Sequence, residues 1–366
     1  MAIHWAILVV LGVAILASLV MAIFFGKHGR TPPYYARHMG WRLGVQGIWL
    51  AGLCLAVGVP VAIFWVVKMP HGGMMMPIVL RQALPALLIA GPAALLLARG
   101  NVDFSIGASM AAAGTCFSAG AANGSTAGGV LAALACVVGI GIANGAIVAI
   151  SRVHSALVTI GMVAVVRAIV FAAQEGRGMV VFDQLPAGAE GTFRAAGWCA
   201  LGLGVVAMIA LAEATPMGRM GLLEPWEETW GQRLLFVGVP FVFSSVAAGI
   251  AGIVMAVEYR VASPLAGEGR ELDALIAAAL GGTFYKARNV GIVGALVAAF
   301  LVVIFQSEIF IGNASPQLMR LYAGVGVVAF ILVGMQFHNL VAWWYHRRSA
   351  RRREGFPVET GAAAAG

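Results

Sequence analysis

Long runs of apolar residues constrain this chain more than any other feature. Residues 5–25 and 130–150 are apolar all round, and a helix of about 20 such residues crosses the roughly 30 Å hydrocarbon core of a bilayer. A membrane barrel would instead need segments of about ten residues that alternate apolar and polar side chains. Hydrophobic residues make up 61% of the sequence, far above the usage of soluble domains. We therefore expect an all-α integral membrane protein.

The apolar runs predict about 10 transmembrane segments, including short broken helices. The expected segments cover residues 5–25, 45–67, 78–98, 105–121, 127–151, 155–173, 196–213, 234–257, 272–284, 290–306 and 319–345. Residues 105–121 and 272–284 are too short for ordinary spans, and both are rich in small residues and bounded by acidic ones. Short helices of this kind end inside the protein, where irregular backbone is tolerated.

Basic residues predict the orientation of the chain, because Lys and Arg are retained on the cytoplasmic side. Four of them lie in the loop 27–42, and five arginines lie in the tail 347–353. If both regions are cytoplasmic, the N-terminus lies outside and the C-terminus inside. The net charge of +8 is then mainly a topology signal, and no nucleic-acid partner is expected. Anionic membrane lipid is a secondary partner of the basic residues.

Catalytic motifs are missing from the sequence. It contains no GxxxxGK[ST] phosphate loop, no HExxH and no GxSxG, which are the patterns that would indicate a nucleotide, zinc or nucleophilic site. We expect a protein that is not an enzyme by itself and that needs no cofactor or metal.

The polar residues inside the expected segments are the candidate functional residues, since an ionisable group in a membrane needs a cavity or a partner. Asp103 and Ser105 precede one short helix, and Glu271 and Asp273 stand in the same relation to Ala274–Leu280 of the other. Such residues can cap a helix by accepting from its free N–H groups. They can also line a substrate pathway, and the pattern leaves both alternatives open.

A third polar region lies in residues 139–171. Gly141 and Gly145 have the GxxxG spacing that lets membrane helices pack closely. Asn144 on the same face can bind a neighbouring helix or line a pathway. Arg167 needs an acid or carbonyl groups nearby, and Asp103 is a candidate partner.

Two parts of the chain follow the same order of features: a long span, a connection with glycine and an acid, and then a short helix of small residues. One part covers about residues 78–173 and the other 234–345. Duplicated halves with broken helices in matching positions are typical of transporters whose substrate passes between the repeats. The pattern predicts a two-repeat permease core.

Several motifs in this region resemble the permease subunits of ribose-type carbohydrate ABC importers. The matching segments are GNVDFSIGA at 100–108, SRVHSALVTIGMVAVVRAIV at 151–170, TPMGR at 215–219 and AGIAGIVMAVEYRVASPLAGEGRELDALIAAALGGT at 248–283. The resemblance covers about residues 78–340. It divides the chain into an additional N-terminal transmembrane hairpin (1–77), a permease core (78–345) and a basic cytoplasmic tail (346–366).

The resemblance implies a subunit of the bacterial inner membrane that works with a second permease copy, cytoplasmic ABC ATPase subunits and a periplasmic solute-binding protein. It implies transport of a sugar or a similar small polar solute. The family's ATPase docking segment follows the TPMGR motif. The implied coupling residues are Thr215, Gly218, Arg219, Glu224 and Trp226.

Two segments depart from the family's pattern. Residues 220–233 replace the usual docking helix with MGLLEPWEETWGQR, and residues 284–288 place FYKAR where the family has a glycine-rich loop. These departures leave two hypotheses: a working permease with an unusual ATPase interface, or a permease-derived subunit that supports or regulates another membrane complex without transporting.

Overall fold

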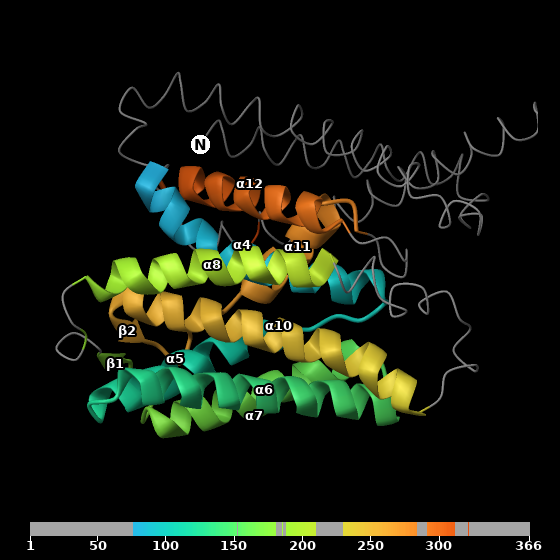
Figure 1. Ribbon diagram of the computed structural model, residues 1–366, viewed down its shortest axis with the longest axis horizontal. Helices are drawn as coiled ribbons and strands as arrows, with labels where there is room; N and C mark the ends of the chain where they lie inside the picture. The colour runs from blue at the N-terminus through green and yellow to red at the C-terminus, as the bar shows by residue number, and fades with distance from the viewer. Residues whose placement is uncertain are drawn as a thin grey trace, which may run out of the picture. The chain divides into compact units, whose positions relative to one another are not determined.

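The described part of the protein is almost entirely helical. The computed structural model describes residues 76–151, 153–180, 185, 188–209, 230–283, 291–311 and 321, and Figure 1 shows their arrangement. The elements are α4 (Met76–Ala98), α5 (Ile106–Ala122), α6 (Thr126–Ser151), α7 (Ser155–Ala173), β1 (Met179–Val180), α8 (Ala189–Ile209), α10 (Trp230–Tyr259), β2 (Val261–Ala262), α11 (Arg270–Leu280) and α12 (Ile292–Ile311).

Five of the described helices are long and apolar enough to cross a membrane: α4, α6, α7, α8 and α10. The predicted class, an all-α integral membrane protein, is confirmed. Three of the expected segments lie outside the described residues: 5–25, 45–67 and nearly all of 319–345. The total of about 10 segments therefore stays a prediction. The proposed hairpin at 1–77 and the tail at 346–366 also lie outside them, apart from residues 76 and 77.

The two short helices form close to where the sequence places them. Helix α5 covers residues 106–122, where 105–121 was expected. Helix α11 covers 270–280, where 272–284 was expected. It ends four residues early because Gly281 and Gly282 follow Leu280, and Gly282 has a φ of +85°, the left-handed conformation that ends many helices at a glycine. Helix α8 begins at Ala189, seven residues before the expected 196.

The two halves of the chain exchange their long helices. Helix α4 of the first half packs against α11 and α12 of the second, and α10 of the second half packs against α5 and α6 of the first. Within each half the short helix also packs against the helix that follows it, α5 on α6 and α11 on α12. This matching order of contacts agrees with the predicted two-repeat core.

Glycines bring the chain together at the same place in both halves. A Cβ atom added to Gly120, near the end of α5, would lie 2.3 Å from the Cα atom of Gly129 in the first turns of α6. A Cβ atom added to Gly281, just after α11, would lie 2.1 Å from the backbone nitrogen of Ala295 in α12. At the end of each short helix, the backbone of the next helix therefore lies too close for any side chain at the glycine.

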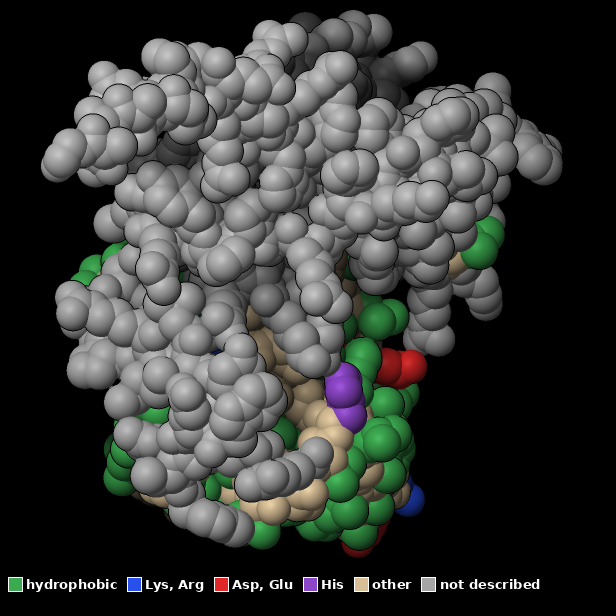
Figure 2. All heavy atoms as spheres, turned by 90° about the vertical axis from the view of Figure 1, so that its right-hand side faces the viewer, with side chains coloured by type: hydrophobic (Ala, Val, Ile, Leu, Met, Phe, Trp, Pro, Cys, Tyr) green, Lys and Arg blue, Asp and Glu red, His purple; other side chains and the backbone are tan. Residues whose placement is uncertain are grey.

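The surface of the described helices is apolar, as a bilayer requires. Leu157 on α7 is 67% exposed and Leu203 on α8 is 73% exposed. Among the described side chains visible in Figure 2, hydrophobic ones predominate and only a few charged ones appear. In water these side chains would be costly to expose, and in lipid they are not.

One end of the helices carries a cluster of charged contacts. Strands β1 and β2 pair there in antiparallel register, with Met179 opposite Ala262. Glu258, near the end of α10, binds Arg194 of α8 at 2.8 Å and Arg81 of α4 at 3.3 Å. Arg260 binds Glu190 at 2.6 Å. We call this the charged end; at the opposite ends of α4 and α10, Arg99 donates to the Phe236 carbonyl at 2.8 Å.

Candidate functional site

The N-terminal ends of the two short helices meet in the protein interior. A Cβ atom added to Gly107, in the first turn of α5, would lie 2.2 Å from the Gly267 carbonyl oxygen and 2.6 Å from Glu271 Oε2. Gly267 precedes α11, and Glu271 lies in its first turn. Backbone N–H groups are unpaired at a helix N-terminus, and the helix dipole is positive there. The meeting point therefore favours negative charge and oxygen acceptors.

Asp103 places a carboxyl group in the loop just before α5. Its side chain is buried, and Oδ1 accepts from the Ser105 backbone N–H at 2.9 Å and from the Ser105 hydroxyl at 2.6 Å. Oδ2 accepts from the Ser244 hydroxyl of α10 at 2.7 Å. The bond to the backbone N–H of Ser105 is of the capping kind. The bond to Ser244 is not, because it joins Asp103 to a helix of the other half.

Asn144 extends this network into α6. Its Nδ2 atom donates to the Ser105 hydroxyl at 2.8 Å, so Ser105 is engaged with Asp103 and Asn144 and does not cap α5 with its side chain. Asn144 is buried, and its Oδ1 atom has no hydrogen-bond partner among the described residues. We call the set Asp103, Ser105, Asn144 and Ser244 the Asp103 network.

The loop that carries Asp103 is also fixed by α7. The backbone N–H of Val102 donates to the Ser155 hydroxyl at 2.8 Å, and that of Phe104 donates to the Thr159 hydroxyl at 3.1 Å. Ser155 and Thr159 lie one turn apart and are both buried. Buried backbone N–H groups in an irregular loop need such partners. The loop before α5 is thus held by α6, α7 and α10 together.

Asp103, the candidate partner of Arg167, is not the group that Arg167 binds. The Arg167 guanidinium donates to the carbonyl of Pro264, in the loop before α11, and its charge also interacts with Glu271 and Glu268. Helix α7 meets the Asp103 loop at Thr159, and eight further residues carry Arg167 about 12 Å along the helix at its usual rise. The expectation that Arg167 needs carbonyl groups or an acid nearby is met by these other partners.

Glu271 and Asp273 have different surroundings although both lie in the first turn of α11. Glu271 Oε1 accepts from the Gly269 backbone N–H at 3.2 Å, a capping contact, while Oε2 is buried without a hydrogen-bond partner among the described residues. Asp273 instead accepts from Arg270 at 3.2 Å and from Gln306 of α12 at 2.7 Å. Glu271 therefore makes a capping contact, whereas Asp273 links α11 to α12.

Sequence reasoning missed Ser244, which completes the Asp103 network. The signal was available, because Ser244 and Ser245 stand together within the apolar run of α10, and hydroxyl groups inside a membrane helix commonly bind a neighbouring helix. Nothing in the sequence marks the Pro264 carbonyl as the acceptor of the Arg167 hydrogen bond.

Gly141 and Gly145 lie where α6 meets α10. Added Cβ atoms would lie 2.6 Å from the Cα atom of Val242 and 2.6 Å from that of Gly238, respectively. The two backbones approach too closely there for any side chain on α6. This close approach brings Asn144, on the same face, within reach of the short helix.

The residues predicted to couple to an ATPase lie outside the described residues. These are Thr215, Gly218, Arg219, Glu224 and Trp226. Most of the unusual segment 220–233 and all of 284–288 lie outside them as well. Among the described residues, no cluster of three or more His, Cys, Asp or Glu side chains could hold a metal ion.

Two curated proteins resemble the chain over most of its length. The galactofuranose transporter permease protein YtfT of Escherichia coli (strain K12) is 27% identical over 325 residues, covering 82% of this chain and 92% of the relative. The L-arabinose ABC transporter permease protein AraH of Azospirillum brasilense is 26% identical over 283 residues, covering 70% of this chain and 75% of the relative. No protein-family model and no solved structure matches the chain. The two relatives confirm the chain's resemblance to the permease subunits of ribose-type carbohydrate ABC importers.

Proposed function

We propose that this protein is the permease subunit of an ABC importer for a monosaccharide or a similar small polar solute. The observation that carries the proposal is the likeness to two sugar permeases over 82% and 70% of the chain. Energy would come from separate ATPase subunits, since the sequence has no phosphate-binding loop of its own. A second permease copy and a solute-binding protein would complete the importer.

The meeting of the short helices supports a role in the substrate pathway. Half-helix N-termini that face each other inside a membrane protein present N–H donors and partial positive charge, which suit the hydroxyl oxygens of a sugar. Arg167, Glu271 and Asp273 add charged hydrogen-bonding groups beside this point. We assign the Asp103 network the role of holding α5 against α6 and α10 while access alternates between the two sides.

The charge distribution supports an orientation with the N-terminus outside the cytoplasm and the C-terminus inside. The arginine-rich tail and the basic loop 27–42 would then face the cytoplasm. In that orientation the charged end with Glu258 faces outward, toward a solute-binding protein. Because both relatives are bacterial proteins, we place this chain in the inner membrane of a bacterium.

A non-transporting role is the alternative, and the sequence of the two unusual segments favours it. Residues 220–233 differ from the family at its docking segment for the ATPase, and residues 284–288 differ from it at a glycine-rich loop. A subunit that had lost this coupling could keep its fold and support or regulate another membrane complex.

The test is to purify the tagged full-length protein from its native membrane in mild detergent and to identify its partners. The recovered complex is then placed in vesicles and assayed for uptake of labelled L-arabinose, D-galactose, D-ribose and D-glucose. ATP-dependent uptake of one of them, abolished by a non-hydrolysable ATP analogue, would support the permease. Recovery of a different membrane complex, with no ATPase and no uptake, would overturn the proposal and favour the alternative.

A further inference from the structure

A cavity of about 430 Å³ lies at the charged end of α10. It is half open and is lined by the last turns of α10, strand β2, the loop that leads to α11, and Gly114 of α5. This volume lies within the range of about 300–1,000 Å³ that is typical of small-molecule sites. The cavity lies apart from the Asp103 network, and none of that network's four residues lines it.

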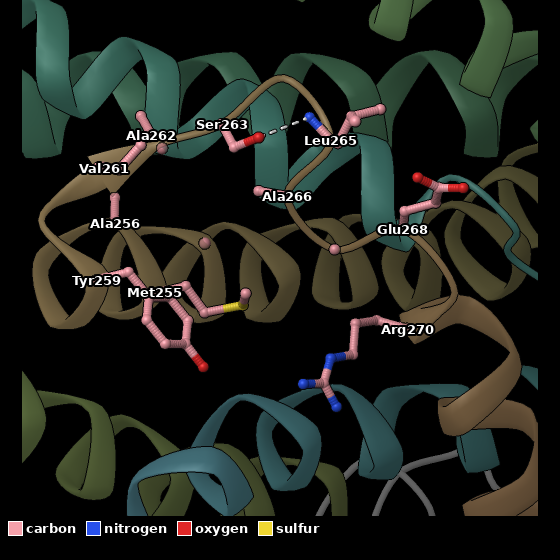
Figure 3. A pocket seen from close by; sticks show the side chains of 13 residues that line it. Met255, Ala256, Tyr259, Val261, Ala262, Ser263, Leu265, Ala266, Glu268 and Arg270 are labelled. Atoms are coloured by element: carbon pink, nitrogen blue, oxygen red, sulfur yellow. Dashed lines mark hydrogen bonds between the residues drawn. The ribbon is translucent and has the colours of Figure 1, made fainter. Parts of the chain in front are cut away.

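The lining combines an apolar floor with polar groups. The floor includes Gly252, Met255 and Ala256 of α10. Figure 3 shows Tyr259, Met255 and the Arg270 guanidinium along one side, and the loop residues that carry Ser263 and Leu265 along the other. A few convergent polar groups over an apolar floor fix the orientation of a small ligand.

The polar groups have chemistry that suits a polyol. Tyr259 is 54% exposed and offers a ring face and a hydroxyl, a combination that binds amphipathic molecules. The Ser263 hydroxyl accepts from the Leu265 backbone N–H at 3.2 Å, which leaves its own proton to donate. Arg270 donates through Nη1 to Asp273 and has further guanidinium N–H groups, and Glu268 adds a carboxylate acceptor. A sugar has an apolar C–H face and an edge of hydroxyl groups that both donate and accept.

One residue links the cavity to the meeting point of the short helices. Gly267 lines the cavity, and its carbonyl oxygen lies against Gly107 of α5. The same loop contains Pro264, the acceptor of Arg167. A molecule in the cavity would therefore touch the loop between α10 and α11, which also contacts α5 and α7.

We propose that this cavity is a monosaccharide-binding site within a single permease subunit. The inference rests on the proposed function for its substrate class. The ring of Tyr259 contacts the apolar face of the sugar, while Ser263, Glu268 and Arg270 bind its hydroxyl groups. A sugar held there occupies a site at the charged end before it reaches the short helices.

The test measures sugar binding by the purified full-length permease without its partners. Saturation-transfer NMR is recorded with L-arabinose, D-galactose, D-ribose and D-glucose for the unmodified chain and for Tyr259→Ala, Tyr259→Phe and Phe171→Ala. Phe171 is the matched control, an exposed aromatic residue on α7 that does not line the cavity. Size-exclusion profiles verify that every variant is folded.

We expect saturation transfer from the unmodified permease to at least one of the four sugars. Removing the Tyr259 ring should weaken that binding about tenfold, the effect of about 1.4 kcal/mol of lost aromatic contact. Tyr259→Phe and Phe171→Ala should retain it. Transfer to none of the four sugars, or equal transfer with Tyr259→Ala, would overturn the inference. If vesicles show uptake but the permease alone binds no sugar, the inference fails and the proposed function stands. If the permease alone binds a sugar but vesicles show no ATP-dependent uptake, the proposed function fails and the binding site stands.

Discussion

Replacing Gly107 by alanine tests whether the meeting of the two short helices is as close as the structure shows. The new Cβ atom would lie 2.2 Å from the Gly267 carbonyl oxygen, and real Cβ atoms essentially never approach closer than 3.0 Å. The contact must therefore open by at least 0.8 Å, the difference of these two distances. The obstacle is backbone, which cannot rotate away as a side chain would. Overpacking of this kind costs about 1–3 kcal/mol.

Gly202→Ala is the matched control, because an added Cβ atom on Gly202 of α8 meets nothing within 4 Å. The thermal unfolding midpoint of each purified variant in detergent and its sugar uptake in vesicles are compared with those of the unmodified protein. We expect Gly107→Ala to unfold at a lower temperature and to lose most of its uptake, while Gly202→Ala keeps both. Equal midpoints and equal uptake for the two variants would refute the close contact of the helices.

Three further substitutions test individual contacts. Asp103→Asn places an amide N–H₂ among hydroxyl donors and should lower stability by about 1–3 kcal/mol, seen as a lower unfolding midpoint; an unchanged midpoint would contradict the network. Arg167→Lys loses the planar donor that reaches the Pro264 carbonyl and should reduce vesicle uptake while leaving the midpoint nearly unchanged, whereas full uptake would remove Arg167 from the pathway. Glu258→Gln removes the acid that pairs with Arg194 and Arg81 and should lower the unfolding midpoint. This loss of stability should be smaller at high salt, which screens ion pairs; a loss independent of salt would argue against ion pairing.

The sequence was sufficient to locate the helices that the structure describes, because the requirement for apolar spans is strong. Helix α7 has the expected bounds, 155–173, and α5 is displaced by one residue. The start of α8 was placed too late, since Glu190 and Arg194 make its first turns look like a polar loop. Glu190 is paired with Arg260, directly after α10, and Arg194 with Glu258 in the last turn of α10. Hydropathy places the start of a span too late where the charges of its first turns are neutralised by residues elsewhere in the fold.

The candidate site was less predictable, because its contacts depend on which helices meet. Asp103 and Asn144 stood out as polar residues within apolar segments, and the structure brings them into one network through Ser105. Ser244 joins that network from 141 residues away, a distance over which a local pattern carries no information. The acceptor of Arg167 was hidden for the same reason, since it is the backbone carbonyl of Pro264, which no residue type reveals.

The exchange of helices between the halves limits how a permease of this design can move. One buried apolar cluster contains residues of α4 and α5 from the first half and of α10, α11 and α12 from the second. Separating the halves as rigid bodies would open this cluster and break the bond between Asp103 and Ser244. Helices α7 and α8 are mostly exposed and contribute little to it. Moving α8 against the core would therefore expose less buried apolar surface than separating the two halves of one chain, whereas moving α7 would also break its hydrogen bonds to the loop that carries Asp103.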